Sequence, residues 1–171
     1  MKTKLMFTLA ASALTVVALA GCTASGTSTS SSPSSAGSGS TATSAAPAKA
    51  ASGADAMTAS TSLGTVVVNS KGLTAYYFDA DKPNSGTSAC TGGCAALWPA
   101  ITTTSATPKV TGITGTVGTI TDPAGTKQIT INGRPIYTFA NDSKAGDVNG
   151  QGVQGVWYVI SPSGAEVKTA K

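Results

Sequence analysis

Histidine is absent from this 171-residue chain, and charged and aromatic residues are scarce, at 11% and 5% of the composition. The absence of histidine removes the commonest metal ligand and the commonest general base near neutral pH. The lysine and arginine residues are scattered and form no basic stripe, which argues against nucleic acid as a partner. Because no nucleophile or metal motif is present, the sequence predicts a protein that is not an enzyme and that needs no cofactor.

Aromatic residues are missing from most of the N-terminal half. All of them except Phe7 lie between Tyr76 and Tyr158. A segment without aromatic side chains cannot bury enough apolar surface to offset the entropy lost on ordering. We therefore predict one folded domain over residues 63–171. Residues 22–62 are almost wholly Ser, Thr, Ala, Gly and Pro after the cysteine, which predicts a disordered tether.

The N-terminus has the pattern of an export signal. A short basic start is followed by the apolar run Leu5 to Leu19, which is too short to span a membrane comfortably. Residues 1–21 are therefore predicted to be a signal peptide. Its end, Leu19-Ala20-Gly21-Cys22, resembles the lipobox of bacterial lipoproteins, which implies cleavage before Cys22 and diacylglycerol on its sulfur. The acyl chains would anchor the protein to the extracytoplasmic face of the cell membrane.

Three cysteines are present, and lipid on Cys22 would leave Cys90 and Cys94 as a pair. Outside the cytoplasm such a pair is expected to form a disulfide, which would fix the glycine-rich loop between its members. A redox or copper(I) dithiol is the alternative, because the spacing resembles the Cys-x-x-x-Cys of copper chaperones. Those copper sites rely on a histidine, which this chain lacks.

A Tyr-x-Phe-x-x-Asp motif occurs twice, and a tryptophan follows each copy at nearly the same distance. The chain is therefore a duplicated unit, with repeat one at about residues 63–101 and repeat two at about 126–164. Tyrosine and phenylalanine two residues apart share one face of a strand, and we predict that this face and both tryptophans belong to the core. The repeated residues are Tyr76, Phe78, Asp81 and Trp98 in repeat one, and Tyr137, Phe139, Asp142 and Trp157 in repeat two.

Turn residues between β-branched runs predict four antiparallel hairpins. One helical turn is expected at Cys94 to Trp98, before Pro99. The fold class is therefore all-β, with two pseudo-equivalent halves in one compact domain. The predicted hairpins join residues 65–68 with 73–78, 119–121 with 127–131, 128–131 with 134–139, and 156–160 with 165–168.

Acidic and amide side chains gather in the loop after each motif. They include Asp79, Asp81 and Asn84 in repeat one, and Asn141, Asp142, Asp147 and Asn149 in repeat two. Turns in which Asp and Asn bond nearby backbone amides explain these residues without a metal. A calcium site is the alternative, although the spacing departs from the calcium-loop pattern at Pro83. A pair of carboxylates in a glycosidase-like site is also left open.

The ordered motifs together resemble one family. Lipobox, tether, repeated motif, Cys-Thr-Gly-Gly-Cys-Ala-Ala-Leu-Trp-Pro and the closing Gly-Val-Trp-Tyr-Val are similar to bacterial lipoproteins that carry a secreted repeat of unknown function. The resemblance covers about Leu63 to Gly164 and implies an envelope location and tandem repeats, with no catalytic residue to carry over. We expect a lipid-anchored binding or structural module for a cell-wall or envelope ligand. An extracytoplasmic redox or metal accessory protein is the alternative.

Replacing Cys22 tests the predicted anchor. Cys22→Ser removes the only thiol that can carry the lipid, so the variant should be released into the medium or remain unprocessed. Membrane fractionation and incorporation of labelled palmitate measure this. Unchanged membrane retention of the variant would count against lipidation.

Overall fold

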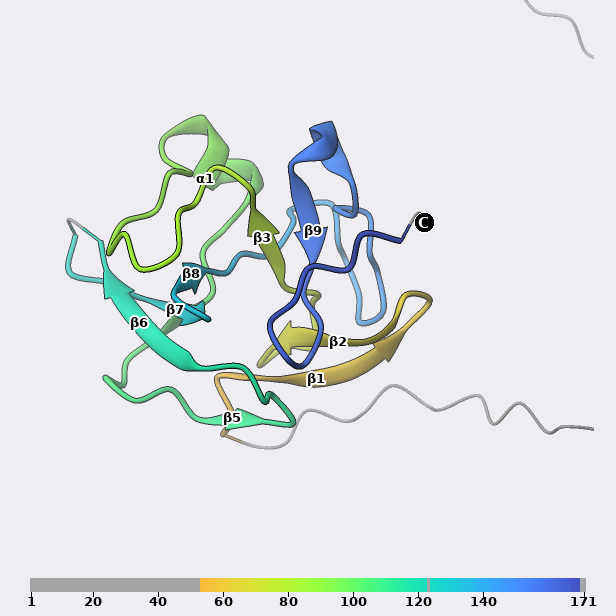
Figure 1. Cartoon of the computed structure of the whole chain (residues 1–171), viewed down its shortest axis with the longest axis horizontal. Helices are drawn as coiled ribbons and strands as arrows, with labels where there is room; N and C mark the ends of the chain where they lie inside the picture. Colours follow the sequence, from red (N-terminus) through yellow and green to blue (C-terminus); the bar gives the residue numbers. More distant parts are fainter. Residues whose placement is uncertain (1–52, 123, 170–171) are drawn as a thin grey trace, which may run out of the picture. The chain divides into compact units, whose positions relative to one another are not determined.

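The computed structural model describes residues 53–122 and 124–169, and these form an antiparallel β domain with short helical turns (Figure 1). The predicted all-β fold is confirmed. The predicted signal peptide, Cys22 and most of the predicted tether lie outside the described residues. In chain order the elements are β1 (Ala56–Thr61), β2 (Gly64–Asn69), β3 (Tyr76–Phe78), α1 (Gly93–Leu97), β4 (Thr102–Thr103), β5 (Val110–Thr111), β6 (Val117–Thr121), β7 (Lys127–Ile131), β8 (Arg134–Pro135), the 3-10 turn η1 (Val153–Gly155) and β9 (Trp157–Val159).

Strand β1 corrects the predicted start of the domain. It pairs antiparallel with β2 over its whole length, and its first two residues, Ala56 and Met57, are buried. The predicted tether therefore does not extend to residue 62. The prediction missed β1 because its residues are mostly small and polar like those of the tether. These residues form a strand because β2 supplies backbone hydrogen-bond partners and the core covers the first two of them.

The first sheet has the strand order β2-β1-β5, and β5 runs parallel to β1. The predicted hairpin between residues 65–68 and 73–78 is reduced to a single bridge between Val68 and Thr74. Strand β2 instead takes β1 as its main partner. Three consecutive valines of β2, residues 66–68, are fully buried, because this strand packs on hydrophobic clusters at both of its faces.

The second sheet has the order β4-β7-β6, and β8 also pairs with β7. Of the two hairpins predicted here, the one between 119–121 and 127–131 is confirmed, whereas the one between 128–131 and 134–139 ends at Ile136, because the residues after it pair with repeat one. Between β7 and β8, Asn132 and Gly133 have φ angles of 50° and 76°, the positive values that a two-residue hairpin turn requires. At the next turn, Asp122 Oδ1 accepts the N–H groups of Ala124 and Thr126, at 2.9 and 2.8 Å. The side chains of these turns thus set the register of the sheet.

Strands β3 and β9 form a third sheet that joins the two repeats, with Phe78 opposite Trp157. The pseudo-equivalent segment of repeat two pairs with repeat one, since Thr138 N–H donates to the Pro99 carbonyl and Ala140 N–H to that of Leu97, both at 2.9 Å. The tyrosine strand of each repeat therefore pairs with the tryptophan segment of the other repeat. The two halves are intertwined rather than placed side by side.

The last predicted hairpin is present, with a β-bridge between Ile160 and Glu166. A cluster of ion pairs stabilises it. The Arg134 guanidinium on β8 binds the Glu166 carboxylate, lies 4.3 Å from the centre of the Tyr77 ring and donates to the Phe78 carbonyl at 2.9 Å. Lys168 also contacts Glu166, at 2.8 Å. Burial alone would raise the pKa of Glu166, but hydrogen bonds from Lys168 and Arg134 outweigh it and lower this pKa to about 2.

The pH dependence of stability should therefore include a contribution from Glu166. A carboxylate with a depressed pKa stabilises the fold fully above its ordinary value of 4.5, and this contribution disappears as the pH falls toward 2. We expect the melting temperature to fall more steeply between pH 5 and 2.5 in the unmodified protein than in Glu166→Gln, which has no charge to lose. Parallel curves for the two proteins would refute this assignment.

Candidate functional site

The two copies of the repeated motif bind each other reciprocally. Tyr76 N–H donates to the Tyr137 carbonyl at 2.8 Å, and Tyr137 N–H donates to the Tyr76 carbonyl at 3.0 Å. The Tyr76 hydroxyl donates to Asp142 Oδ2 and the Tyr137 hydroxyl to Asp81 Oδ2, both at 2.6 Å. Each repeat thus supplies the carboxylate that the tyrosine of the other repeat needs.

The motif aspartates also close loops within their own repeats. Asp81 Oδ1 accepts the N–H of Ala89 at 2.7 Å, and Asp142 Oδ1 accepts that of Asn149 at 2.9 Å. Oδ1 of each aspartate thus bonds a backbone amide, as predicted, but that amide lies eight or seven positions along the chain rather than in a tight turn. The prediction missed the bonds to Oδ2. The exact recurrence of aspartate five residues after tyrosine in both copies was the signal that could have suggested a shared partner.

Four aromatic rings stack through the centre of the domain in the order Phe78, Trp157, Trp98 and Phe139. Their centres are separated in turn by 4.4, 3.7 and 4.3 Å, and the two indoles are parallel to within 1°. Each phenylalanine stacks on the tryptophan of the other repeat. Both tryptophans are at most 3% exposed, so the predicted burial is confirmed. Such pairs add about 0.5–1.5 kcal/mol each beyond the area they bury.

Both motif tyrosines are held in their protonated form. Burial, followed by the hydrogen bond to Asp142, raises the pKa of Tyr76 far above its ordinary value. Burial and the bond to Asp81 do the same to the pKa of Tyr137. The hydroxyls therefore remain donors to the carboxylates at any physiological pH, which suits a permanent structural link between the repeats.

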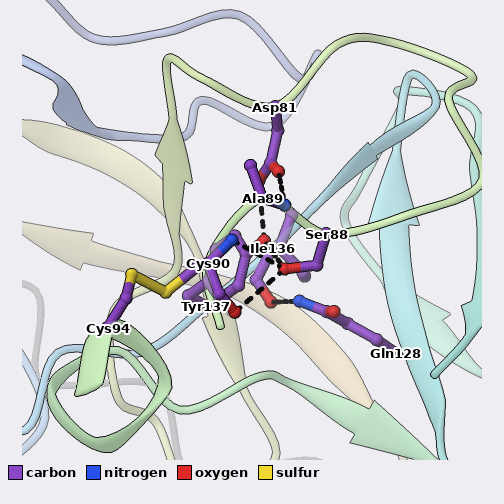
Figure 2. The surroundings of a disulfide bond; sticks show 8 residues. All are labelled: Asp81, Ser88, Ala89, Cys90, Cys94, Gln128, Ile136 and Tyr137. Atoms are coloured by element: carbon purple, nitrogen blue, oxygen red, sulfur yellow. Dashed lines mark hydrogen bonds between the residues drawn. A yellow bond between two sulfur atoms is a disulfide. The ribbon is translucent and has the colours of Figure 1, made fainter. Parts of the chain in front are cut away.

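The predicted disulfide is present, and it lies beside the repeat-two motif (Figure 2). It joins Cys90 to Cys94 at the start of α1. The Ser88 hydroxyl lies 2.7 Å from that of Tyr137 and accepts the Cys90 N–H at 3.1 Å. The disulfide loop is thus tied to the same tyrosine that binds Asp81, and its position is set by both repeats.

A cavity of about 410 Å³ lies between this disulfide loop and β6. Its wall is mostly apolar. Buried side chains from both repeats form part of it, so neither repeat could build it alone. Residues that line it include Cys90, Ala95, Trp98, Ile120, Gln128 and Tyr137.

The two repeats differ at the corresponding place. On the repeat-two side, Gly150 packs directly against Tyr76 and Trp98, and a Cβ atom at this position would lie 2.8 Å from each of them. That loop contains no cysteine, so the bond to Asp142, which corresponds to the bond to Asp81 in repeat one, has no disulfide beside it. The domain thus has a cavity beside the disulfide loop of repeat one, whereas the corresponding place in repeat two is closely packed at Gly150.

The remaining acidic residues make contacts within the fold. Asp79 lies 3.6 Å from Arg134, and Asp147 Oδ2 accepts the N–H groups of Ser143 and Lys144 at 3.0 and 3.1 Å. In the part of the chain that the structure describes, no three His, Cys, Asp or Glu side chains come together as a metal-binding group. The carboxylates that suggested calcium are therefore distributed among separate structural contacts.

Comparison with protein families shows which family the chain belongs to. The model of a family described as a secreted repeat of unknown function matches twice, at residues 57–102 and 118–161. The chain belongs to this family. No curated protein and no solved structure matches the chain.

Membership of the secreted-repeat family puts the protein outside the cytoplasm, in agreement with the disulfide. The two matches confirm the duplication, and both begin earlier than the predicted repeats, at residues 57 and 118. These starts correspond to β1 and β6, so each family repeat opens with a hairpin. Among residues 53–122 and 124–169, no helix has the length and apolar character that crossing a membrane requires.

Tyrosine-to-phenylalanine variants test the reciprocal link. Tyr76→Phe leaves Asp142 Oδ2 buried without its hydroxyl donor, and Tyr137→Phe does the same to Asp81. Each should lower the free energy of unfolding by about 1–3 kcal/mol in urea titrations. The matched control is Tyr158→Phe, whose hydroxyl bonds the Gly155 carbonyl at an exposed site. Equal losses in all three variants would show that the carboxylate pairs have no special role.

Proposed function

We propose that this protein is a non-enzymatic binding module of the cell envelope, held at the outer face of the membrane by lipid on Cys22. Its ligand site in this proposal is the cavity beside the Cys90–Cys94 disulfide. The observation that carries the proposal is the cavity itself. Its volume of about 410 Å³ falls within the range of small-molecule sites, and its wall combines apolar side chains with a few hydroxyl and amide groups.

The rigidity of the wall favours binding. Tyr137 is fixed by Asp81 and lies beside Ser88, and the disulfide restrains the loop that carries Cys90. Gln128 is held by its own bond to the Ile136 carbonyl, at 3.1 Å (Figure 2). A wall that is already ordered loses little conformational entropy when a ligand enters, so more of the contact energy contributes to affinity.

The chemistry of the wall favours binding over catalysis. Asp122 is the one carboxylate among the described lining residues, and it is exposed, with Oδ1 occupied by the turn after β6. The raised pKa of Tyr137, caused first by burial, makes this tyrosine a poor source of protons. General acid–base catalysis commonly uses two groups that exchange protons, and the described lining residues offer no second carboxylate and no histidine beside Asp122.

A neutral apolar dye tests the site. We expect N-phenyl-1-naphthylamine to bind the purified protein saturably, with a rise in dye fluorescence. Ala95→Trp places a large side chain into the cavity and should weaken binding about tenfold or more, the change that losing the burial of one aromatic group produces.

Ala96→Trp is the matched control, because Ala96 is an exposed neighbour in the same helix that does not line the cavity. It should bind the dye as the unmodified protein does. Melting temperatures of both variants verify that the domain is intact. Equal dye affinity in the two variants, or no saturable binding by the unmodified protein, would refute the site.

A further inference from the structure

Strand β6 pairs with β7 through only half of its backbone groups. At its two ends, Asp122 N–H donates to the Thr126 carbonyl at 3.0 Å, and Asn132 N–H donates to the Thr116 carbonyl at 2.7 Å. Hydrogen-bonded pairs alternate along an antiparallel ladder, so the even-numbered residues of β6 face β7. The odd-numbered residues must direct their N–H and C=O groups to the opposite side.

The bonds of β7 agree with this alternation. Ile129 lies opposite Thr119, yet it donates to the Ile101 carbonyl at 2.8 Å and accepts from Ile136 N–H at 3.1 Å, on the far side of β7. Thr119 therefore makes no backbone hydrogen bond to β7. Within residues 53–122 and 124–169, the outer edge of β6 has no strand paired to it. The outward groups belong to Val117, Thr119 and Thr121.

This edge lacks the usual protection against strand addition. Natural edge strands commonly carry charges, prolines or bulges that prevent another strand from pairing. The sequence of β6, Val-Gly-Thr-Ile-Thr, has no charge and no proline, and it pairs with β7 in unbroken register. Such an edge is suited to accept an extended peptide through main-chain hydrogen bonds.

The cavity lies on one face of the same sheet. Ile120 of β6 and Gln128 of β7 are directly paired, so their side chains share a face, and both line the cavity. On a strand added to β6, the residue opposite Ile120 would have its side chain on that face, about 4.5–5.5 Å from it between Cβ atoms. That side chain would therefore lie beside Ile120, on the face of the sheet that bears the cavity.

We propose that β6 binds an extended peptide segment of a partner protein by strand addition, with one large apolar side chain of the peptide in the cavity. This inference rests on the proposed function and names the ligand class of the same site. Main-chain bonds to Thr119 and Thr121 provide affinity for any extended chain. The cavity selects for an aromatic or leucine-sized side chain between the residues that make those bonds.

Two other possible occupants, the predicted tether and a second copy of the domain, fit the cavity less well. Residues 23–52 of the chain contain no Val, Leu, Ile, Met or aromatic residue, so the predicted tether has no side chain to fill the cavity. A second copy paired antiparallel over the whole of β6 would place Gly118 opposite Ile120 and leave the cavity empty. The size of the cavity therefore favours a different chain.

Labelled pentapeptides test the proposal by fluorescence anisotropy. The probe acetyl-Thr-Val-Phe-Val-Thr-amide should bind, and the same peptide with central alanine should bind about tenfold or more weakly. N-methylation of both valines removes the donors that face β6 and should abolish measurable binding. In the protein, Thr119→Pro removes an outward N–H without touching a bond to β7, whereas Thr119→Val keeps it. Thr119→Pro should therefore bind the probe about tenfold or more weakly than Thr119→Val does.

The outcomes separate this inference from the proposed function. Dye binding without peptide binding, or equal affinity for the N-methylated probe, would overturn strand addition and leave the cavity as a small-molecule site. Failure of both dye and peptide would overturn the proposed function itself. A dimer that is abolished by Thr119→Pro would assign β6 to a second copy and also overturn the inference. The N-methylated probe needs no change in the protein, so the test holds even if Thr119→Pro fails to fold.

Discussion

The reciprocal hydrogen bonds of Tyr76 and Tyr137 are the interaction on which the rest of the domain depends. The two residues share backbone hydrogen bonds, and each sends its hydroxyl to the aspartate of the other repeat. Each repeat supplies a donor for Oδ1 of its own aspartate, but the donor for the buried Oδ2 comes from the other repeat, and a buried carboxylate oxygen without a donor is costly. This reciprocity explains why the family repeat occurs here as a pair within one intertwined domain. It also explains why the ring stack alternates between repeats.

The two repeats share these contacts but differ in their loops. Repeat one carries the disulfide loop and α1, while repeat two carries the glycine-rich loop that ends at η1. The cavity lies beside the disulfide loop, and its other wall comes from β6 and β7. Tyr137, which Asp81 holds by a hydrogen bond, is itself part of this wall, so the link between the repeats also shapes the proposed ligand site.

Much of the fold follows from local sequence signals. The Asn132-Gly133 turn, the β7 hairpins and the burial of the aromatic motif were all predictable, because turn chemistry and alternation act over a few residues. Strand β1 was missed since its composition matches that of the tether. The partner of β2 was also predicted wrongly. Two apolar runs separated by a turn suggest a hairpin, but in the structure β2 pairs mainly with β1.

Residue types at characteristic spacings were sufficient to predict the duplication, the all-β class, the disulfide and the family. The folded chain was needed to show which repeat each side chain contacts, where the cavity lies and that the outer edge of β6 is unpaired among the described residues. These features depend on contacts between residues far apart in the chain, such as Tyr76 with Asp142, 66 residues away. Because the two motif copies are identical in pattern, spacing alone could not distinguish bonds within a repeat from bonds between repeats.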